Sequence, residues 1–180
     1  MNFHAVIQSY ITYQFHEKSE NPNLLAFSFH LFLARRRTAC PGGFDLIGGN
    51  CYKVSNERMG WIEAKKMCEA TNSQLLSFQS PDEAENLVKF IQRTNPRRTR
   101  FEFWTGGNDI DKESNWVWSG QSPFKEPVAD FGWLDRPFPS AEENCLTWSI
   151  TITNIRRGTM SQGWHSDSCC NNIYFICELP

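Results

Sequence analysis

The seven cysteines are the residues of this chain whose side chains could do the most chemistry, because a thiol can bind metal, exchange electrons or form a disulfide. Six of them are interleaved with tryptophans over most of the chain: Cys40, Cys51, Cys68, Cys145, Cys169 and Cys177. A zinc site on Cys169 and its neighbour Cys170 would need further ligands at suitable spacing, and the sequence offers none. The pattern therefore predicts disulfides and an oxidising, extracellular environment.

The remaining reactive side chains do not indicate catalysis. His165, Ser166 and Asp167 are the residue types of a hydrolytic triad, but adjacent positions cannot form the line of nucleophile, base and orienting group. The chain has no glycine-rich phosphate-binding motif and no dinucleotide fingerprint. We therefore expect a binding protein and not an enzyme.

Composition narrows the kind of partner. The 180 residues carry a net charge of -2, so no overall basic field favours nucleic acid. Basic residues gather in three short runs (35–37, 97–100 and 156–157), which we interpret as solvated surface. Fourteen phenylalanines and seven tryptophans supply ample material for a core or an interface.

The first 39 residues differ from the rest, and we expect them to be an extension outside the folded domain. Residues 24–34 form an apolar run that falls short of the roughly 20 residues of a membrane span but suits the core of a secretory signal. Acidic residues precede the run and three arginines follow it, which does not fit an intact signal. We interpret residues 1–39 as a degraded or mis-started secretory signal. A helical appendage and a mistaken gene start are the alternatives.

Two helices are expected to position the first part of the domain. Residues 60–71 place Trp61, Ala64 and Cys68 at helical spacing. The second helix begins at the capping box of residues 80–83, Ser-Pro-Asp-Glu, and its apolar residues then recur at i, i+3, i+4 and i+7 until Asn95-Pro96 ends it.

After residue 100 the hydrophobic period changes to two, which indicates strands. Short strands are predicted at 101–104, 116–118 and 174–177, and the clearest one runs from 145 to 153, where large apolar residues alternate with serine and threonine. Residues 120–143 are rich in proline and show no period. A loop that long in a compact domain is usually functional.

Several motifs occur in one order along this framework: Cys51-Tyr52, Trp61/Ala64/Cys68, Phe103-Trp104-Thr105-Gly106-Gly107, Trp116-Val117-Trp118-Ser119-Gly120, Glu143-Asn144-Cys145, Trp164 before Cys169, and Phe175-Ile176-Cys177-Glu178. Together they resemble the C-type lectin domain over roughly residues 40–178. The resemblance implies an α+β fold in which two helices flank small antiparallel sheets, with a long loop and three disulfides. We assign this domain to residues 40–180.

The resemblance also implies how the cysteines pair. The family pattern joins Cys40 to Cys51, Cys68 to Cys177, and Cys145 to Cys169, and it leaves Cys170 unpaired. A free thiol, an intermolecular disulfide, or a swapped pairing of Cys170 with Cys145 all remain open for that residue.

Calcium is the cofactor that the resemblance raises. In sugar-binding members, a calcium ion on the long loop ligates sugar hydroxyls directly, and calcium needs about six to eight oxygen ligands. The family takes some of them from residues around a proline that follows the loop tryptophan. Here that proline is Pro137, and its neighbours Arg136 and Phe138 cannot coordinate calcium.

Other positions of the family's calcium site are also altered. Glu143 keeps the acid before the next cysteine, whereas His165-Ser166 replaces the expected Asn-Asp pair and Asp167 comes one position late. We therefore expect no required cofactor. A rebuilt calcium site is the alternative, drawing on Asp135, Glu142, Glu143 and Asp167.

The long loop and its neighbours are expected to bind the ligand through Asp135, Arg136, Phe138, Glu143, Asn144, His165 and Asp167. Arginine and aromatic side chains on an exposed loop are typical of binding hot spots, so Arg136→Ala should weaken binding without lowering the melting temperature. The tryptophans Trp133, Trp148 and Trp164 are expected to fill the core beneath the loop.

The resemblance implies a secreted recognition module for a glycan or cell-surface glycoprotein, as in adhesion or innate immunity. The alternative is calcium-independent binding of a protein ligand, as in adhesion, toxin-like or inhibitory modules. Neither a nucleic acid partner nor a membrane span is expected.

Overall fold

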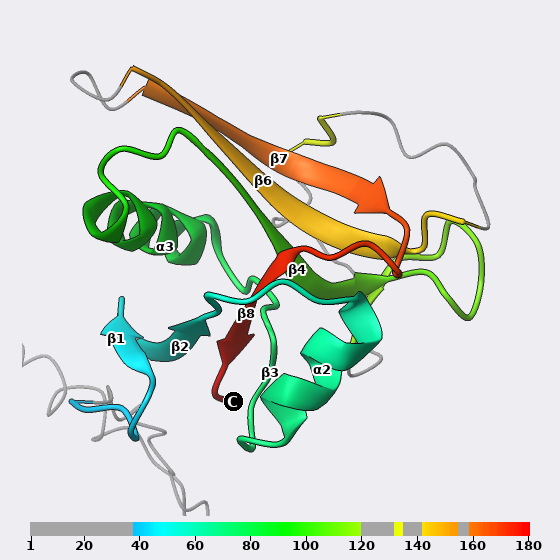
Figure 1. Cartoon of the computed structure of the whole chain (residues 1–180), viewed down its shortest axis with the longest axis horizontal. Helices are drawn as coiled ribbons and strands as arrows, with labels where there is room; N and C mark the ends of the chain where they lie inside the picture. Colours follow the sequence, from blue (N-terminus) through cyan, green and yellow to red (C-terminus); the bar gives the residue numbers. More distant parts are fainter. Residues whose placement is uncertain (1–37, 120–131, 135–141, 155–158) are drawn as a thin grey trace, which may run out of the picture. The chain divides into compact units, whose positions relative to one another are not determined.

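The computed structural model describes residues 38–119, 132–134, 142–154 and 159–180 (Figure 1). The interpretation of residues 1–39 as a secretory signal falls almost wholly outside the described residues, and so do Asp135, Arg136 and Phe138. The division of the chain at residue 40 stays a prediction.

Both expected helices are present, as α2 (Trp61–Glu69) and α3 (Pro81–Thr94). The Ser80 hydroxyl accepts a hydrogen bond of 3.4 Å from the backbone N–H of Glu83, which confirms the N-cap. The Glu83 carboxylate reaches one residue further back than in a regular capping box, to the N–H of Gln79 at 2.7 Å. The same carboxylate accepts a hydrogen bond from the buried Tyr52 hydroxyl, and this bond fixes α3 to the sheet.

Within the described ranges, eight strands form the sheet: β1 (Asp45–Ile47), β2 (Asn50–Val54), β3 (Gln74–Leu75), β4 (Arg100–Asn108), β5 (Val117–Trp118), β6 (Cys145–Asn154), β7 (Thr159–Asp167) and β8 (Tyr174–Glu178). Their order is β1-β2-β8-β4-β6-β7, with β3 beside β8 and β5 beside β4. The small antiparallel sheets that we expected are thus joined into one path. The joint is the parallel pairing of β4 with β8, in which Phe103 lies opposite Tyr174.

Strand β6 has the predicted alternation, and its partner β7 was not anticipated. Leu146, Trp148, Ile150 and Ile152 are buried, as expected for one covered face. Strand β7 pairs with β6 along almost its whole length, from Asp167 opposite Cys145 to Thr159 opposite Asn154, and Figure 1 shows the two as a long twisted hairpin. Most β7 residues are polar, so no hydrophobic period marks this edge strand.

The core consists of two clusters. One lies between α3 and the sheet and contains Trp118, Trp148 and Trp164, with Phe78 edge-on to Trp148 at 4.8 Å between ring centres. The other lies against α2, where the Trp61 indole donates to the carbonyl of Thr105. Full burial of Trp148 and Trp164 confirms two of the three expected core tryptophans.

The three disulfides are those that the resemblance implied: Cys40–Cys51, Cys68–Cys177 and Cys145–Cys169. Their Cα–Cα distances of 5.6, 5.3 and 5.2 Å lie within the usual range. The longest closure, over 109 residues, ties α2 to the last strand. Cys170 is exposed and unpaired.

Candidate ligand-binding site

The expected site lies at the end of the sheet where β6 begins and β7 ends. The strand register places Asp167 opposite Cys145, and the Cys145–Cys169 disulfide holds the turn after β7 against the start of β6. Glu143 and Asn144 directly precede β6 and therefore lie near the end of β7. Because strand residues alternate between faces, half-buried His165 shares the face of Asp167 and not that of buried Trp164.

The two expected carboxylates take part in the local structure. Asp167 Oδ1 accepts hydrogen bonds of 2.7 Å from the Ser168 N–H and from the Asn171 side chain, so it stabilises the turn after β7. Exposed Glu143 accepts a hydrogen bond of 3.4 Å from the Ser166 hydroxyl. Glu143 is therefore the more accessible acceptor of the two.

Asp109 is a further acidic residue at this end, and the sequence analysis did not single it out. Its N–H donates to the carbonyl of Asn144 at 3.2 Å, which brings the end of β4 next to the predicted site. Its Oδ2 accepts a hydrogen bond of 2.8 Å from the Ser114 N–H. Only 3% of Asp109 is exposed, and this burial, followed by the charge of Glu113, raises the pKa of its carboxyl.

The residues of this end were tested for their fit to calcium. Asp109 Oδ1 is buried without a hydrogen-bond partner among the described residues, and a cation there would compensate it. However, calcium needs about six to eight oxygen ligands, and the described part of the chain contains no group of three or more acidic, histidine or cysteine side chains that could hold a metal ion. The described residues therefore do not fit a calcium site.

A short piece of the long loop is anchored beside the site. The Leu134 N–H donates to the carbonyl of Trp164 at 2.9 Å, and the Trp164 N–H donates to the carbonyl of Gly132 at 3.0 Å. This close approach requires a glycine at position 163, because a Cβ there would lie 2.9 Å from the carbonyl oxygen of Gly132. Trp133 is only partly buried, unlike the other two predicted core tryptophans. The centre of its ring lies 5.2 Å from the centre of the Trp116 ring.

The structure places four of the seven residues predicted to bind ligand near the start of β6 and the end of β7. His165 and Asp167 lie on one face of β7, whereas Glu143 contacts Ser166 of the opposite face. The other three residues lie outside the described part of the chain. Ligand binding by all seven stays a prediction.

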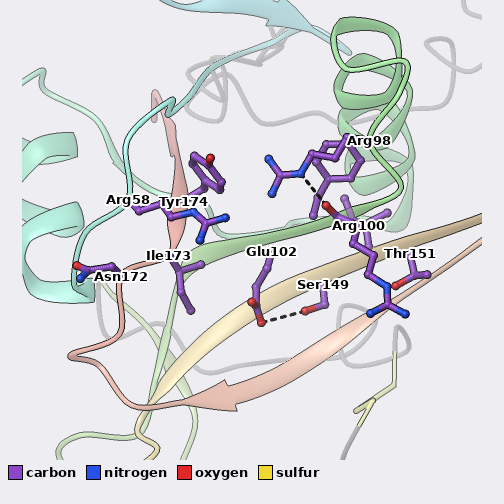
Figure 2. A pocket seen from close by; sticks show the side chains of 11 residues that line it. Arg58, Arg98, Arg100, Glu102, Ser149, Thr151, Asn172, Ile173 and Tyr174 are labelled. Carbon is purple, nitrogen blue, oxygen red and sulfur yellow. Dashed lines mark hydrogen bonds between the residues drawn. The ribbon is translucent and has the colours of Figure 1, made fainter.

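A basic pocket elsewhere on the sheet was missed. The 97–100 run was interpreted as solvated surface, yet Arg98 and Arg100 line a cavity of about 270 Å³ together with Arg58 and Tyr174 (Figure 2). Strand alternation could not have indicated it, because Arg98 precedes β4 and the pocket forms only when distant segments carry Arg58 and Tyr174 beside it.

Comparison with known proteins identifies the family of this fold. Residues 57–179 match the family model described as "Lectin C-type domain", so the chain belongs to the C-type lectin domain family and is a lectin-like recognition domain. A curated relative, C-type lectin domain family 4 member M of Nomascus concolor, is 28% identical over 141 residues, which are 78% of this chain and 31% of that protein. The CD209 antigen of Symphalangus syndactylus is 27% identical over 140 residues, 78% of this chain and 32% of its own length.

A solved structure also supports membership of the C-type lectin domain family. The mouse scavenger receptor C-type lectin carbohydrate-recognition domain superposes with a TM-score of 0.57 at 26% identity, covering 77% of this chain and 94% of that one. The chain spans about a third of the length of the two curated relatives. Among the described residues, we find no helix with the length and apolar character of a membrane span.

Proposed function

We propose that residues 40–180 form an extracellular carbohydrate-recognition domain that binds a glycan at the start of β6, the end of β7 and the adjacent long loop. The observation that carries this proposal is that four polar residues, Glu143, Asn144, His165 and Asp167, lie near the strand ends that the Cys145–Cys169 disulfide joins. The mouse domain that superposes at 26% identity is titled a carbohydrate-recognition domain, which supports the same assignment.

The chemistry of the site suits sugar hydroxyls. A hydroxyl both donates and accepts hydrogen bonds, and carboxylate, amide and imidazole groups can pair with it. Next to these groups, the rings of Trp116 and Trp133 are half-buried, so part of each ring remains accessible to a sugar. The loop residues Asp135, Arg136 and Phe138 complete the proposed set.

The proposed binding does not use a calcium bridge. Asp167 Oδ1 is occupied by the turn that it stabilises, and Arg136 and Phe138 replace oxygen ligands in the sequence. Direct hydrogen bonds and ring contacts then supply the affinity. The three disulfides support secretion, because such bonds persist in oxidising compartments.

A protein ligand is the second candidate. Leu134 is 48% exposed beside Trp133, and an exposed apolar side chain next to aromatic residues is typical of the centre of a protein interface. For this alternative, Leu134→Ala would have a larger effect than any change to Glu143.

A glycan array probed with the full chain, once with calcium and once with chelator, tests the proposal. We expect the same glycans to be bound under both conditions, and we expect Glu143→Ala and Arg136→Ala to weaken binding by about tenfold each. Glu69→Ala is the matched control, because Glu69 is an exposed glutamate on α2. No bound glycan, or binding that requires calcium, would contradict the proposal.

A further inference from the structure

The basic pocket lies further along the β4–β6 pair than the proposed glycan site. It is lined by Arg58, Arg98, Arg100, Phe101, Glu102, Ser149, Ile150, Thr151, Asn172, Ile173 and Tyr174, and has a volume of about 270 Å³. In the β4–β6 register Glu102 lies opposite Ser149, whereas Asn108 lies opposite Cys145 near the glycan site. On β6 these two positions are four residues apart, which is roughly 13 Å along the strand. Glu143, Asn144, His165 and Asp167 do not line the pocket, so it is a distinct surface.

Its charge is unbalanced. Three guanidinium groups line it, from the segment after β2 (Arg58), the segment after α3 (Arg98) and the first residue of β4 (Arg100). None of the three belongs to the ion pairs found among the described residues, which join Lys65 to Glu69 and Lys89 to Glu85. The pocket contains one carboxylate, Glu102, so its lining carries a net positive charge.

The Glu102 carboxylate already has partners. It accepts hydrogen bonds from the hydroxyls of Ser149 at 3.3 Å and Thr147 at 3.4 Å, and Figure 2 shows the first of these as a dashed line between Glu102 and Ser149. The positive charge of the arginines is therefore left for a ligand.

Two of the arginines are held in place around Tyr174. Their guanidinium carbons lie 4.6 Å (Arg58) and 4.9 Å (Arg98) from the centre of its ring. Arg98 also donates to the carbonyl of Arg100 at 2.8 Å and contacts the Phe101 ring at 4.9 Å. A hydrogen bond from Arg58 and its charge, and then Arg98, lower the pKa of the Tyr174 phenol, which is a sign of the positive field.

A second hollow of about 330 Å³ continues this surface. It is lined by Lys89, Gln92, Arg93, Asn95, Pro96, Arg98 and Ile152, so it shares Arg98 with the first pocket. Arg93 lies on α3 and extends the positive charge beyond the first pocket, whereas Lys89 on the same helix is paired with Glu85. Two adjoining basic hollows fit an elongated ligand with repeated negative groups better than they fit one small anion.

We propose that this surface, defined by Arg58, Arg98, Arg100 and Tyr174 with Lys89 and Arg93 beside them, binds a sulfated polysaccharide, with a sulfate ester held between the arginines. The planar guanidinium fork matches the oxygens of such an ester. Ser149, Thr151 and Asn172 offer hydroxyl and amide groups to the sugar hydroxyls. This site acts independently of the proposed glycan site.

Nucleic acid is the less suitable polyanion. Single strands bind by stacking their bases on exposed aromatic rings, and the aromatic rings of this pocket, Tyr174 and Phe101, are both contacted by arginine. The net charge of -2 also provides no wider basic field to hold a phosphate backbone.

Titration calorimetry of the full chain with a size-defined heparin oligosaccharide tests the proposal. At about 150 mM salt we expect binding that weakens as salt is raised, and we expect Arg58→Ala and Arg100→Ala to weaken it by about tenfold each. Arg58→Lys, which keeps the charge but loses the fork, should fall in between. Arg97→Ala is the matched control, because this exposed neighbour lines neither hollow.

Several results would overturn the proposal. They are no binding of heparin, equal binding of the chemically desulfated oligosaccharide, an effect of Arg97→Ala as large as that of Arg58→Ala, or tighter binding of polyphosphate or DNA of the same length. Glu143→Ala should leave heparin affinity unchanged. A failure here is thus distinguishable from a failure at the proposed glycan site.

Discussion

The two ends of the β4–β6 pair carry opposite charge and use it differently. At the glycan-site end, Asp109 and Asp167 accept hydrogen bonds from backbone and side-chain groups of their own turns. At the other end, Arg58 and Arg98 converge on Tyr174, and neither forms an ion pair within the described residues.

This difference separates structural charges from charges that await a ligand. A carboxylate that accepts two hydrogen bonds, such as that of Asp167, stabilises the turn that it closes. Neighbouring guanidinium groups without a carboxylate partner repel one another, so they do not stabilise the fold. The predictions below test this contrast.

Removing the Cys68–Cys177 disulfide should have the largest effect and should damage both ends. It closes 109 residues and fixes α2 to the strand that carries Tyr174. In the chain-entropy model, Cys68→Ala with Cys177→Ala should lower the free energy of unfolding by about 5 kcal/mol, measured by urea denaturation.

The Cys145–Cys169 bond is the matched control for that prediction. It closes 24 residues at the glycan-site end, so its removal should cost about 3 kcal/mol and weaken glycan binding while heparin binding persists. If the two double variants lost the same unfolding free energy, and both lost glycan binding and heparin binding equally, the proposed difference between the two ends would be contradicted.

Stability should also depend on pH through Glu178, which is buried between β8 and the segment that follows α2. Burial raises the pKa of its carboxyl from 4.5 to about 7, although Ser77 and Gln74 donate hydrogen bonds to it. Between these values the folded state holds a proton that the unfolded state has lost. The contribution of Glu178 to stability should therefore be fully present below about pH 4.5 and be lost, by about 3 kcal/mol, as the pH rises through 7.

Urea denaturation at several pH values, with Glu178→Gln as the comparison, measures this dependence. The amide cannot ionise, so the variant should show a flatter profile over that window. The guanidinium groups stay charged throughout, so heparin affinity should not follow the change in stability. An identical slope in the variant would show that another group is responsible.

The smallest effects compare single charges at the two ends. Asp167→Ala removes two hydrogen bonds of 2.7 Å from the turn after β7 and should cost about 1–3 kcal/mol of stability. Arg58→Ala removes an exposed charge that lacks an ion-pair partner in the described structure, and should change stability by less than about 0.5 kcal/mol. Thermal melts of both variants check this, and an Arg58→Ala variant that is destabilised as much as Asp167→Ala would refute it.

The sequence predicted those features of the fold that are determined by residues close together in the chain. The cap at Ser80 and the alternation along β6 are encoded within a few residues, and the structure confirms both. The disulfide pairing came from the order of family motifs, since spacing alone cannot choose among the possible pairings.

The missed features depend on residues that are distant in sequence. The parallel contact of Phe103 with Tyr174 joins strands that a period of two cannot assign to each other. Strand β7 is polar and is positioned by its pairing with β6. The basic pocket forms only when β8 carries Tyr174 to a place between Arg58 and Arg98, so the basic run alone was interpreted as solvated surface.

The central claim is that this recognition domain has two separate ligand surfaces at the two ends of β4–β6. A titration of the isotope-labelled full chain with heparin oligosaccharide, followed by backbone amide chemical shifts, tests it most directly. We predict shifts at Arg58, Arg98, Arg100 and Tyr174, with Glu143 and Asp167 unchanged. Shifts concentrated at Glu143 to Asp167, or absent at the arginines, would contradict it.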